Sequence, residues 1–344
     1  MSKRPNFATM RSFSLVWLLL GAIGCKGSEP APAAEKSTQV QPAAPAAKPA
    51  EPQVVKVGYQ KIGVPFLLKE RAEALQKQLA DKNARLEWVE FQAGPPILEA
   101  MRAGAVDIGY VGETPPVFAQ AGGVPFVYVA SDAPAPASEA ILVPKTSKLK
   151  SVKELKGKHV ALNRGSNVHY LLVRALEEAG LTLDDLQVTY LAPPDARSAF
   201  EGGQLDAWVI WDPFQAAAEE HGARVLRDGQ GLVDNRFYYV ARRDFATSQA
   251  ELLRLVLAEF ERLTGWARTR PEEVAQILAR SSGIAYEALL RAEKRHTYQL
   301  EAITPEILDK QQKIADSFSK LQLIPKTIQL RDAFLAQVAY GSGS

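Results

Sequence analysis

The residues best placed to do chemistry follow the ends of predicted strands. Residues 163–169 have the sequence Asn-Arg-Gly-Ser-Asn-Val-His and separate an apolar strand pattern from an apolar helix pattern. Gly165 lets the backbone approach a ligand closely, and Ser166 or Asn167 is of the type that begins a helix. The free N–H groups and the dipole of a helix start attract an anion. This turn therefore predicts either an anion site or an ordinary helix cap.

Three further turns carry similar residues. Residues 112–116 and 211–214 place a cap residue before proline, and proline fits the first position of a helix. Residues 60–61 end the first predicted strand. Because four such turns are expected to converge on one crevice, we interpret them together as a ligand site. The predicted ligand-binding residues are Gln60, Gly112, Glu113, Thr114, Asn163, Gly165, Ser166, Asn167, His169, Trp211 and Asp212.

Two carboxylates in these turns fit an anion site poorly. Glu113 and Asp212 would repel an anionic head group if they faced it in the ionised form. We expect them to cap helices, to bridge the two lobes that are predicted below by pairing with Arg164 or Arg197, or to contact a cationic part of a ligand.

The signals for enzyme or metal chemistry are weak. The four histidines lack the spacing of metal ligands, and neither a Gly-x-Ser-x-Gly string nor a phosphate-binding Gly-x-x-x-x-Gly-Lys string occurs. Cys25 is the single cysteine, so an intramolecular disulfide is impossible. The sequence predicts no catalytic residue, no metal and no cofactor.

The elements that position these turns occur in two similar segments. Each has a strand, a helix, a strand, a second helix and a Gly-x-x-Asp turn into a final strand. Alternating strand and helix patterns of this kind predict parallel βαβ units. The first segment has strands at 55–60, 85–91 and 108–111, with helices at 67–79 and up to 102. The second has strands at 159–163, 187–191 and 207–211, with helices at 169–179 and up to 201.

The repeat predicts two α/β lobes with a cleft between them. Residues 237–241 form a strand pattern that returns to the first lobe, and crossings are expected near 143–150 and 232–240. Lobe 1 is predicted to comprise residues 54–145 and 237–340, and lobe 2 residues 146–236. The rest of lobe 1 is predicted to be helical at 252–267, 271–279, 286–295 and 305–321.

The first 53 residues have a different composition. A basic start and an apolar run at 13–23 predict a signal peptide over 1–24, too short to span a bilayer stably. Cys25 follows Ala-Ile-Gly, which indicates a lipobox with an acylated thiol. Residues 25–53 contain few large apolar side chains and predict a disordered tether to a membrane. Residues 341–344 are predicted to be a flexible tail.

The net charge excludes one class of partner. The chain of 344 residues carries +2, and removing the three basic residues of the predicted signal peptide leaves −1. A nucleic-acid or polybasic membrane surface would require a strong positive excess. Anion binding must therefore come from a local site.

With these residues in view, the sequence resembles the aliphatic sulfonate-binding proteins of ABC importers, within the nitrate, sulfonate and taurine group of solute-binding proteins. The resemblance covers about residues 54–340. It implies the type II periplasmic-binding-protein fold, a partner permease, a monomer, and a place outside the cytoplasm. The matching strings are residues 58–61, 109–120, 140–145, 155–172 and 195–214.

The resemblance and the turn chemistry imply a small anionic ligand, an alkanesulfonate. A sulfonate stays singly charged and offers three acceptor oxygens, so it needs a ring of N–H and hydroxyl donors. Other ligands on the same fold remain open: taurine, nitrate or a thiamine precursor. An enzyme similar to the thiamine-pyrimidine synthases is a further alternative, although the cysteine-rich string expected of those enzymes is missing.

Overall fold

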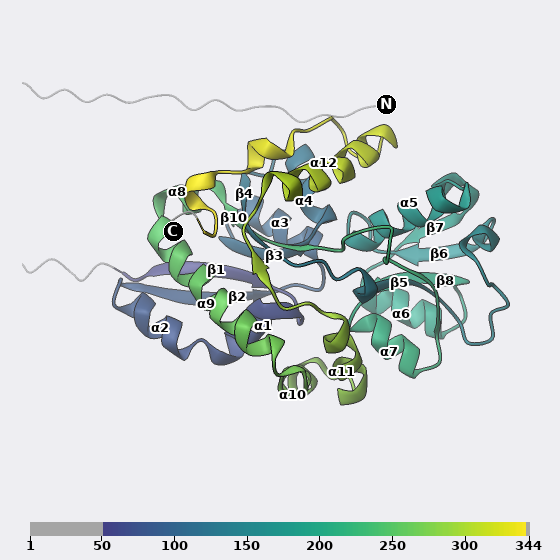
Figure 1. Ribbon diagram of the computed structural model, residues 1–344, viewed down its shortest axis with the longest axis horizontal. Coiled ribbons are helices and arrows are strands. Elements are labelled where there is room, and N and C mark those ends of the chain that lie inside the picture. Colours follow the sequence, from purple (N-terminus) through teal and green to yellow (C-terminus); the bar gives the residue numbers. More distant parts are fainter. Residues whose placement is uncertain (1–50, 342–344) are drawn as a thin grey trace, which may run out of the picture. The chain divides into compact units, whose positions relative to one another are not determined.

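The computed structural model describes residues 51–341 (Figure 1). The predicted signal peptide, the acylated Cys25, nearly all of the tether and residues 342–344 lie outside this range. Within residues 51–341, no helix is both long enough and apolar enough to cross a membrane.

The described residues form two β-sheets, each covered by helices. The first sheet has the strand order β11-β4-β10-β3-β1-β2, and the second has the order β7-β6-β8-β5-β9. The strands of the first sheet are β1 (Gln53–Tyr59), β2 (Ala84–Glu90), β3 (Ile108–Gly112), β4 (Phe126–Asp132), β10 (Phe237–Arg242) and β11 (Leu300–Glu301). Those of the second are β5 (Glu139–Val143), β6 (His159–Leu162), β7 (Gln187–Tyr190), β8 (Ala207–Trp211) and β9 (Arg224–Asp228).

The predicted repeat is present in both sheets. Strand β1 pairs in parallel with β2 and β3, and β6 pairs in parallel with β7 and β8. Each sheet continues through an antiparallel strand, β10 in the first and β5 in the second. Strands β3 and β8 are buried along their whole length, as expected for short apolar strands covered on both faces.

The predicted lobe boundary at residue 145 is wrong by one strand. Strand β5 lies in the second sheet, between β8 and β9, although the sequence pattern assigned it to lobe 1. The crossovers between the sheets are therefore residues 133–138 and 229–236. The apolar run of β5 would fit either core, and only its antiparallel pairing with β8 decides which sheet it joins.

Most helices lie within a few residues of their predicted positions, but residues 67–79 form two helices that break at Ala72. The first buries a continuous run at 63–68, and the second buries Leu75 and Leu79. The helices are α1 (Gly63–Arg71), α2 (Glu73–Ala80), α3 (Gly94–Arg102), α4 (Thr114–Ala121), α5 (Asn167–Ala179), α6 (Pro193–Glu201), α7 (Phe214–Glu220), α8 (Arg243–Ser248), α9 (Ala250–Arg268), α10 (Pro271–Ser282), α11 (Tyr286–Arg295) and α12 (Pro305–Lys320).

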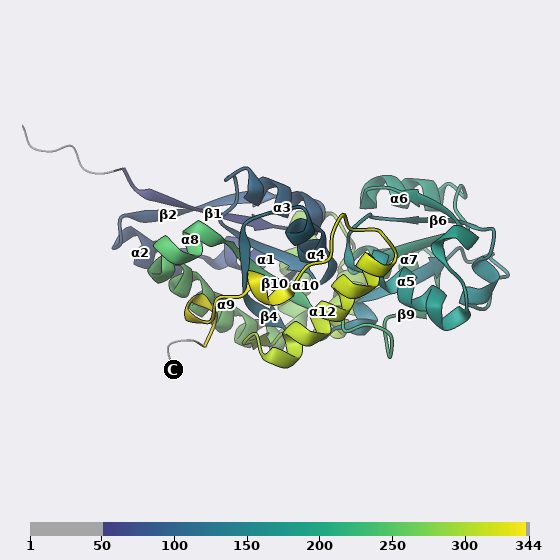
Figure 2. The same cartoon turned by 90° about the horizontal axis from the view of Figure 1, so that it is seen from above.

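Two C-terminal helices join the lobes on either side of the crossovers. Helix α11 packs on α7 of the second lobe, and Arg295 of α11 forms ion pairs with Asp212 and Glu219. Helix α12 runs from the side of the first sheet toward α5 (Figure 2), where Phe318 packs on Tyr170. The cleft is therefore bounded by helices that belong to the first lobe in sequence and touch the second.

Candidate functional site

A small cavity lies where the two lobes meet, and we call it the head cavity. Its volume is about 10 Å³, close to the roughly 10–15 Å³ that a cavity needs in order to hold one water molecule. Among the residues that the structure describes, none that line it is charged. It is lined by Gln60, Gly94, Gly112, Pro115, Ser166, Asn167, Trp211 and Phe237. Five of the eleven predicted site residues are thus brought together.

The first turn of α5 faces the turn before α4 across this cavity. Ser166 is the N-cap residue of α5, as predicted, and Asn167 is the first residue of the helix. A Cβ atom added to Gly112 would overlap the side-chain amide of Asn167, so the two lobes touch here. Only glycine at position 112 allows this approach. Among the described residues, the backbone N–H groups of Asn167 and Val168 have no backbone partner and are available to an anion, whereas His169 N donates to Ser166 O at 3.0 Å.

The polar side chains of the head cavity are already engaged within the protein. Gln60 Nε2 donates to Tyr110 O at 3.3 Å, and Asn167 Nδ2 donates to Asn235 Oδ1 at 2.6 Å. Each amide nitrogen carries a second N–H, for which no partner is found among residues 51–341. Ser166 differs, because its single hydroxyl proton goes to Asn163 O at 2.7 Å. Gln60 and Asn167 are therefore better donors for a ligand than the Ser166 hydroxyl.

The predicted cap at Thr114 is wrong. Helix α4 begins at Thr114, and its N-cap is Glu113, which has helical backbone angles and makes no side-chain cap. Thr114 is fully buried, and within residues 51–341 its hydroxyl has no hydrogen-bond partner. The two prolines that follow fix the helix start without a side-chain cap, because they lack the N–H groups that a cap would bind.

Glu113 faces away from the head cavity. Its Oε2 accepts a hydrogen bond from the backbone N of Arg236 at 3.0 Å, and it lines a groove behind the crossovers with Asp234 and Lys310. Burial raises the pKa of Glu113 to about 7, and the backbone N–H of Arg236 opposes the shift. The lobe-bridging partners predicted for this carboxylate, Arg164 and Arg197, are wrong. Glu113 instead contacts Arg236 in the crossover at residues 229–236.

Asp212 precedes the N-cap residue of α7, which is Pro213 and not Asp212 as the sequence predicted, and it does not pair with either predicted arginine. Its Oδ1 accepts from Ala216 N at 3.0 Å, and Arg295 lies 3.3 Å from Oδ2. Arg197 instead pairs with Glu201 on its own helix. Burial raises the pKa of Asp212 to about 6, and the charge of Arg295 opposes the shift. The partner was missed because Arg295 is distant in sequence.

Three further predicted residues lie behind the head cavity. Asn163 Nδ2 donates to Leu191 O at 3.4 Å, and Gly165 has φ +71, a conformation that favours glycine. His169 is buried, its Nδ1 faces Gly165 N at 3.3 Å, and its ring packs near Phe118. Burial lowers the pKa of His169 to about 4, so the imidazole is neutral at pH 7. These residues support the turn from behind.

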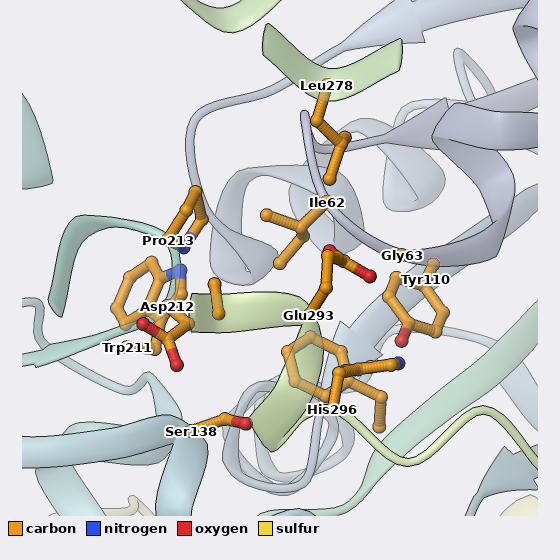
Figure 3. A pocket seen from close by; sticks show the side chains of 12 residues that line it. Ile62, Gly63, Tyr110, Ser138, Trp211, Asp212, Pro213, Leu278, Glu293 and His296 are labelled. Carbon is orange, nitrogen blue, oxygen red and sulfur yellow. The ribbon is translucent and has the colours of Figure 1, made fainter. Parts of the chain in front are cut away.

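A second cavity, the inner cavity, lies next to the head cavity and shares Trp211 and Phe237 with it. Figure 3 shows the side chains that line the inner cavity. Its volume is about 30 Å³. None of the described residues that line it is a lysine or an arginine. It is lined by Ile62, Gly63, Tyr110, Ser138, Trp211, Asp212, Pro213, Phe237, Leu278, Ala292, Glu293 and His296.

The inner cavity is rich in hydrogen-bond acceptors. Glu293 Oε2 accepts from Tyr298 OH at 2.7 Å, and burial raises the pKa of Glu293 to about 8. Burial lowers the pKa of His296 to about 4. Within the part of the chain that the structure describes, the buried Ser138 hydroxyl and His296 Nε2 have no hydrogen-bond partner. This cavity suits an uncharged polar group or a hydrogen-bond donor better than an anion.

A third cavity opens outward from Gln60 and Trp211, and we call it the outer cavity. It has a volume of about 240 Å³ and is lined partly by Phe91, Pro194 and Phe214. Lys61 and Arg197 also line it. Trp211 is thus common to all three cavities.

Sequence reasoning missed several lining residues. Phe237 begins the returning strand, which the sequence predicted without assigning it to a site. Glu293 and His296 lie at the end of a C-terminal helix that showed only an amphipathic pattern. Ser138 lies in the crossover that the sequence placed too late. An acidic residue on the apolar face of α11 was the one signal that could have drawn attention to Glu293.

Comparisons with known proteins show which family the sequence matches. Residues 48–281 match the model of the NMT1-like family. The aliphatic sulfonates-binding protein of Escherichia coli (strain K12) is 39% identical over 81% of this chain and 88% of its own. That of Bacillus subtilis (strain 168) is 28% identical over 81% of this chain and 84% of its own.

A solved structure shares the two-lobed fold. The alkanesulfonate-binding protein of Xanthomonas axonopodis pv. citri bound to MOPS superposes with a TM-score of 0.78 at 35% identity. The match covers 83% of this chain and 99% of that chain. The predicted architecture of two α/β lobes around a ligand cleft, the type II periplasmic-binding-protein fold, is therefore confirmed.

Proposed function

Because the chain belongs to the NMT1-like family, together with the aliphatic sulfonate-binding proteins, we propose that it captures an aliphatic sulfonate between its lobes and delivers it to an ABC import permease. The periplasmic space is the place for such a protein, as the names of its relatives indicate. The observation that carries the proposal is the head cavity, which both lobes build from uncharged donors around a helix start.

The chemistry of the head cavity fits a strong monoanion. A sulfonate presents three acceptor oxygens and stays ionised across the physiological range, so it needs donors and no acceptor. The second side-chain N–H groups of Gln60 and Asn167, with the backbone N–H groups of Asn167 and Val168 at the start of α5, supply such donors from two sides. The dipole of the thirteen-residue helix α5 favours negative charge at the same point.

Capture requires the lobes to move. The head cavity of about 10 Å³ holds about one water, less than a sulfonate group needs. A ligand must therefore enter while Gly112 and Asn167 are further apart, and the lobes then close around it, by rotation about the crossovers, to a state with a wider head cavity than this structure has.

The shape of the cleft offers two places for the ligand tail. A short tail with a polar end fits the inner cavity, where Ser138 and Glu293 offer acceptors. A bulky tail fits the outer cavity beside Phe214. Trp211 separates the two, so the orientation of its ring selects the tail.

Calorimetry of the full-length protein tests the head-group assignment. Ethanesulfonate should bind more tightly than propanoate, which has the same chain length but a carboxylate head. Both ligands are monoanions at pH 7, so overall charge cannot explain a difference. Equal or tighter binding of propanoate would refute the sulfonate assignment, even though the binding-protein assignment would stand.

We also propose that the protein is held at a membrane through acylated Cys25. The support is the sequence alone: a basic start, an apolar run and a small residue directly before Cys25. Metabolic labelling with palmitate should mark the natural protein and not Cys25→Ser, which should be released in soluble form. Equal labelling of both proteins, or labelling of neither, would exclude the anchor.

A further inference from the structure

Asn235 lies where the two crossovers between the lobes meet. Its Nδ2 donates to Ala135 O at 2.9 Å, and Ala135 N donates back to Asp234 O at 3.0 Å. Ala135 belongs to crossover 133–138, and the other two residues belong to crossover 229–236. Asn235 is 1% exposed. A single buried side chain therefore ties the two connections that the lobes must rotate about.

Both ligand-site turns are fastened to the same point of the second crossover. Asn167, in the turn of lobe 2, donates to Asn235 Oδ1 at 2.6 Å. Glu113, in the turn of lobe 1, accepts from Arg236 N at 3.0 Å. Gly112, which belongs to the same turn as Glu113, lies against the side-chain amide of Asn167. Any rotation about the crossover thus moves both halves of the head cavity.

We propose that Asn235 is a positioning residue that acts through Asn167, and that it couples sulfonate capture to the arrangement of the crossovers. The hydrogen bond to Asn235 uses one of the two N–H groups of the Asn167 amide and fixes the plane of that amide. The other N–H is then held toward the head cavity, so less side-chain entropy is lost when a ligand binds. The inference rests on the proposed function.

The backbone at Asn235 makes a clean variant possible. Its φ is 46°, in the left-handed region that asparagine tolerates and glycine adopts freely. Asn235→Gly therefore removes the amide without straining the backbone. Asn83 provides a matched control, because it also has a positive φ, 50°, and is exposed between α2 and β2. Asn83→Gly repeats the same chemical change away from the cleft.

A double-mutant cycle on the full-length protein, with ethanesulfonate as the probe, tests the coupling. Asn235→Gly should weaken binding about tenfold, as loss of one positioned hydrogen bond does. In an Asn167→Ala background the same change should alter affinity by less than about twofold, because the Asn167 amide that Asn235 positions is absent. Asn83→Gly should bind normally. An equal loss in both backgrounds, or no loss in either, would overturn the proposal.

A measurement without ligand separates this proposal from the proposed function. Backbone hydrogen exchange in the first turn of α5 and in residues 133–138 should be faster in Asn235→Gly than in the natural protein and in Asn83→Gly. Unchanged exchange in both segments would overturn the coupling. If the natural protein binds no sulfonate but exchange accelerates as expected, the proposed function fails while the positioning role of Asn235 stands.

Discussion

The head cavity and the inner cavity share the Trp211 and Phe237 side chains and have opposite polarity. The head cavity offers donors: amide N–H groups and the start of α5. The inner cavity offers acceptors, among them Glu293 and the hydroxyl of Ser138, which has no partner among the described residues. Under the proposed function, these two adjoining spaces of opposite polarity would receive the two different ends of one ligand.

The two cavities also differ in how their polarity is made. The donors of the head cavity are neutral groups, so they attract an anion without burying a counter-charge. The inner cavity contains a carboxyl whose pKa is raised to about 8 by burial, so Glu293 is mostly protonated at pH 7. Burial removes the carboxyl from water, so its neutral form has a lower free energy than the buried carboxylate. The polarity of the head cavity is therefore the same at any physiological pH, while that of the inner cavity changes as Glu293 ionises.

The largest expected effect breaks the head cavity itself. Gly112→Ala places a Cβ into the amide of Asn167 and prevents the lobes from meeting. We expect sulfonate affinity to fall at least about 100-fold, the loss of about 2.7 kcal/mol. Titration calorimetry measures the affinity, and small-angle scattering should show no ligand-induced compaction.

Gly265→Ala is the control for that change, because a Cβ at Gly265 in α9 meets no atom within 4 Å. It should leave affinity unchanged. Normal binding and compaction of Gly112→Ala would show that the lobes do not close through this contact.

The sequence predicted Gly112 as a site residue, but it could not predict the close approach of Gly112 to the Asn167 amide. Cap residues and prolines mark where each strand gives way to a helix, and this local chemistry is enough to place Gln60, Ser166, Asn167 and Trp211 at one crevice. The direction of a side chain within a turn depends on tertiary contacts instead. Glu113 therefore turned toward Arg236, a partner 123 residues away.

The lobe boundary shows the same limit at a larger scale. The parallel part of each sheet repeats along the sequence, so β2-β1-β3 and β7-β6-β8 were predictable as two units. Strand β5 joins the second sheet through antiparallel pairing with β8, and its apolar residues fit either core. The acceptors of the inner cavity come partly from α11, whose docking on α7 depends on long-range ion pairs such as Arg295 with Asp212.

A second prediction ranks the donors of the head cavity. Asn167→Ala should weaken ethanesulfonate about 10- to 100-fold, since a hydrogen bond to a charged group contributes about 1.5–3 kcal/mol. Ser166→Ala should cost less than about threefold, because the Ser166 hydroxyl donates to Asn163 O and not into the cavity. Calorimetry of both variants decides the ranking. A larger loss for Ser166→Ala would mean that the hydroxyl turns toward the ligand on binding.

A third prediction sharpens the contrast between the two ends. A 2-aminoethanesulfonate places its ammonium where Glu293 can accept a hydrogen bond, so Glu293→Gln should weaken this ligand about tenfold at pH 8. Ethanesulfonate lacks the ammonium and should bind both proteins alike, which makes it the internal control. Equal effects on the two ligands would show that the tail does not enter the inner cavity.

The smallest expected effect concerns stability as a function of pH. An acid whose folded pKa lies above its unfolded value binds its proton more tightly in the folded state, so stability is lost as pH rises toward the folded pKa. Glu293, at about 8, and Glu113 and Asp132, at about 7, all have this sign. His169 and His296, at about 4, have the opposite linkage, but their contribution is complete above the unfolded pKa of about 6.5.

Between about pH 6.5 and 8, therefore, among these described groups the carboxyls with raised pKa govern how stability changes with pH, and the thermal midpoint should fall over this interval. Glu293→Gln keeps the shape of the side chain and cannot ionise, so its midpoint should fall less steeply and exceed that of the natural protein at pH 8.5. Scanning calorimetry at pH 6.5 and 8.5 measures both slopes. A variant with the same slope as the natural protein would show that Glu293 already ionises normally, and that the inner cavity is as independent of pH as the head cavity beside it.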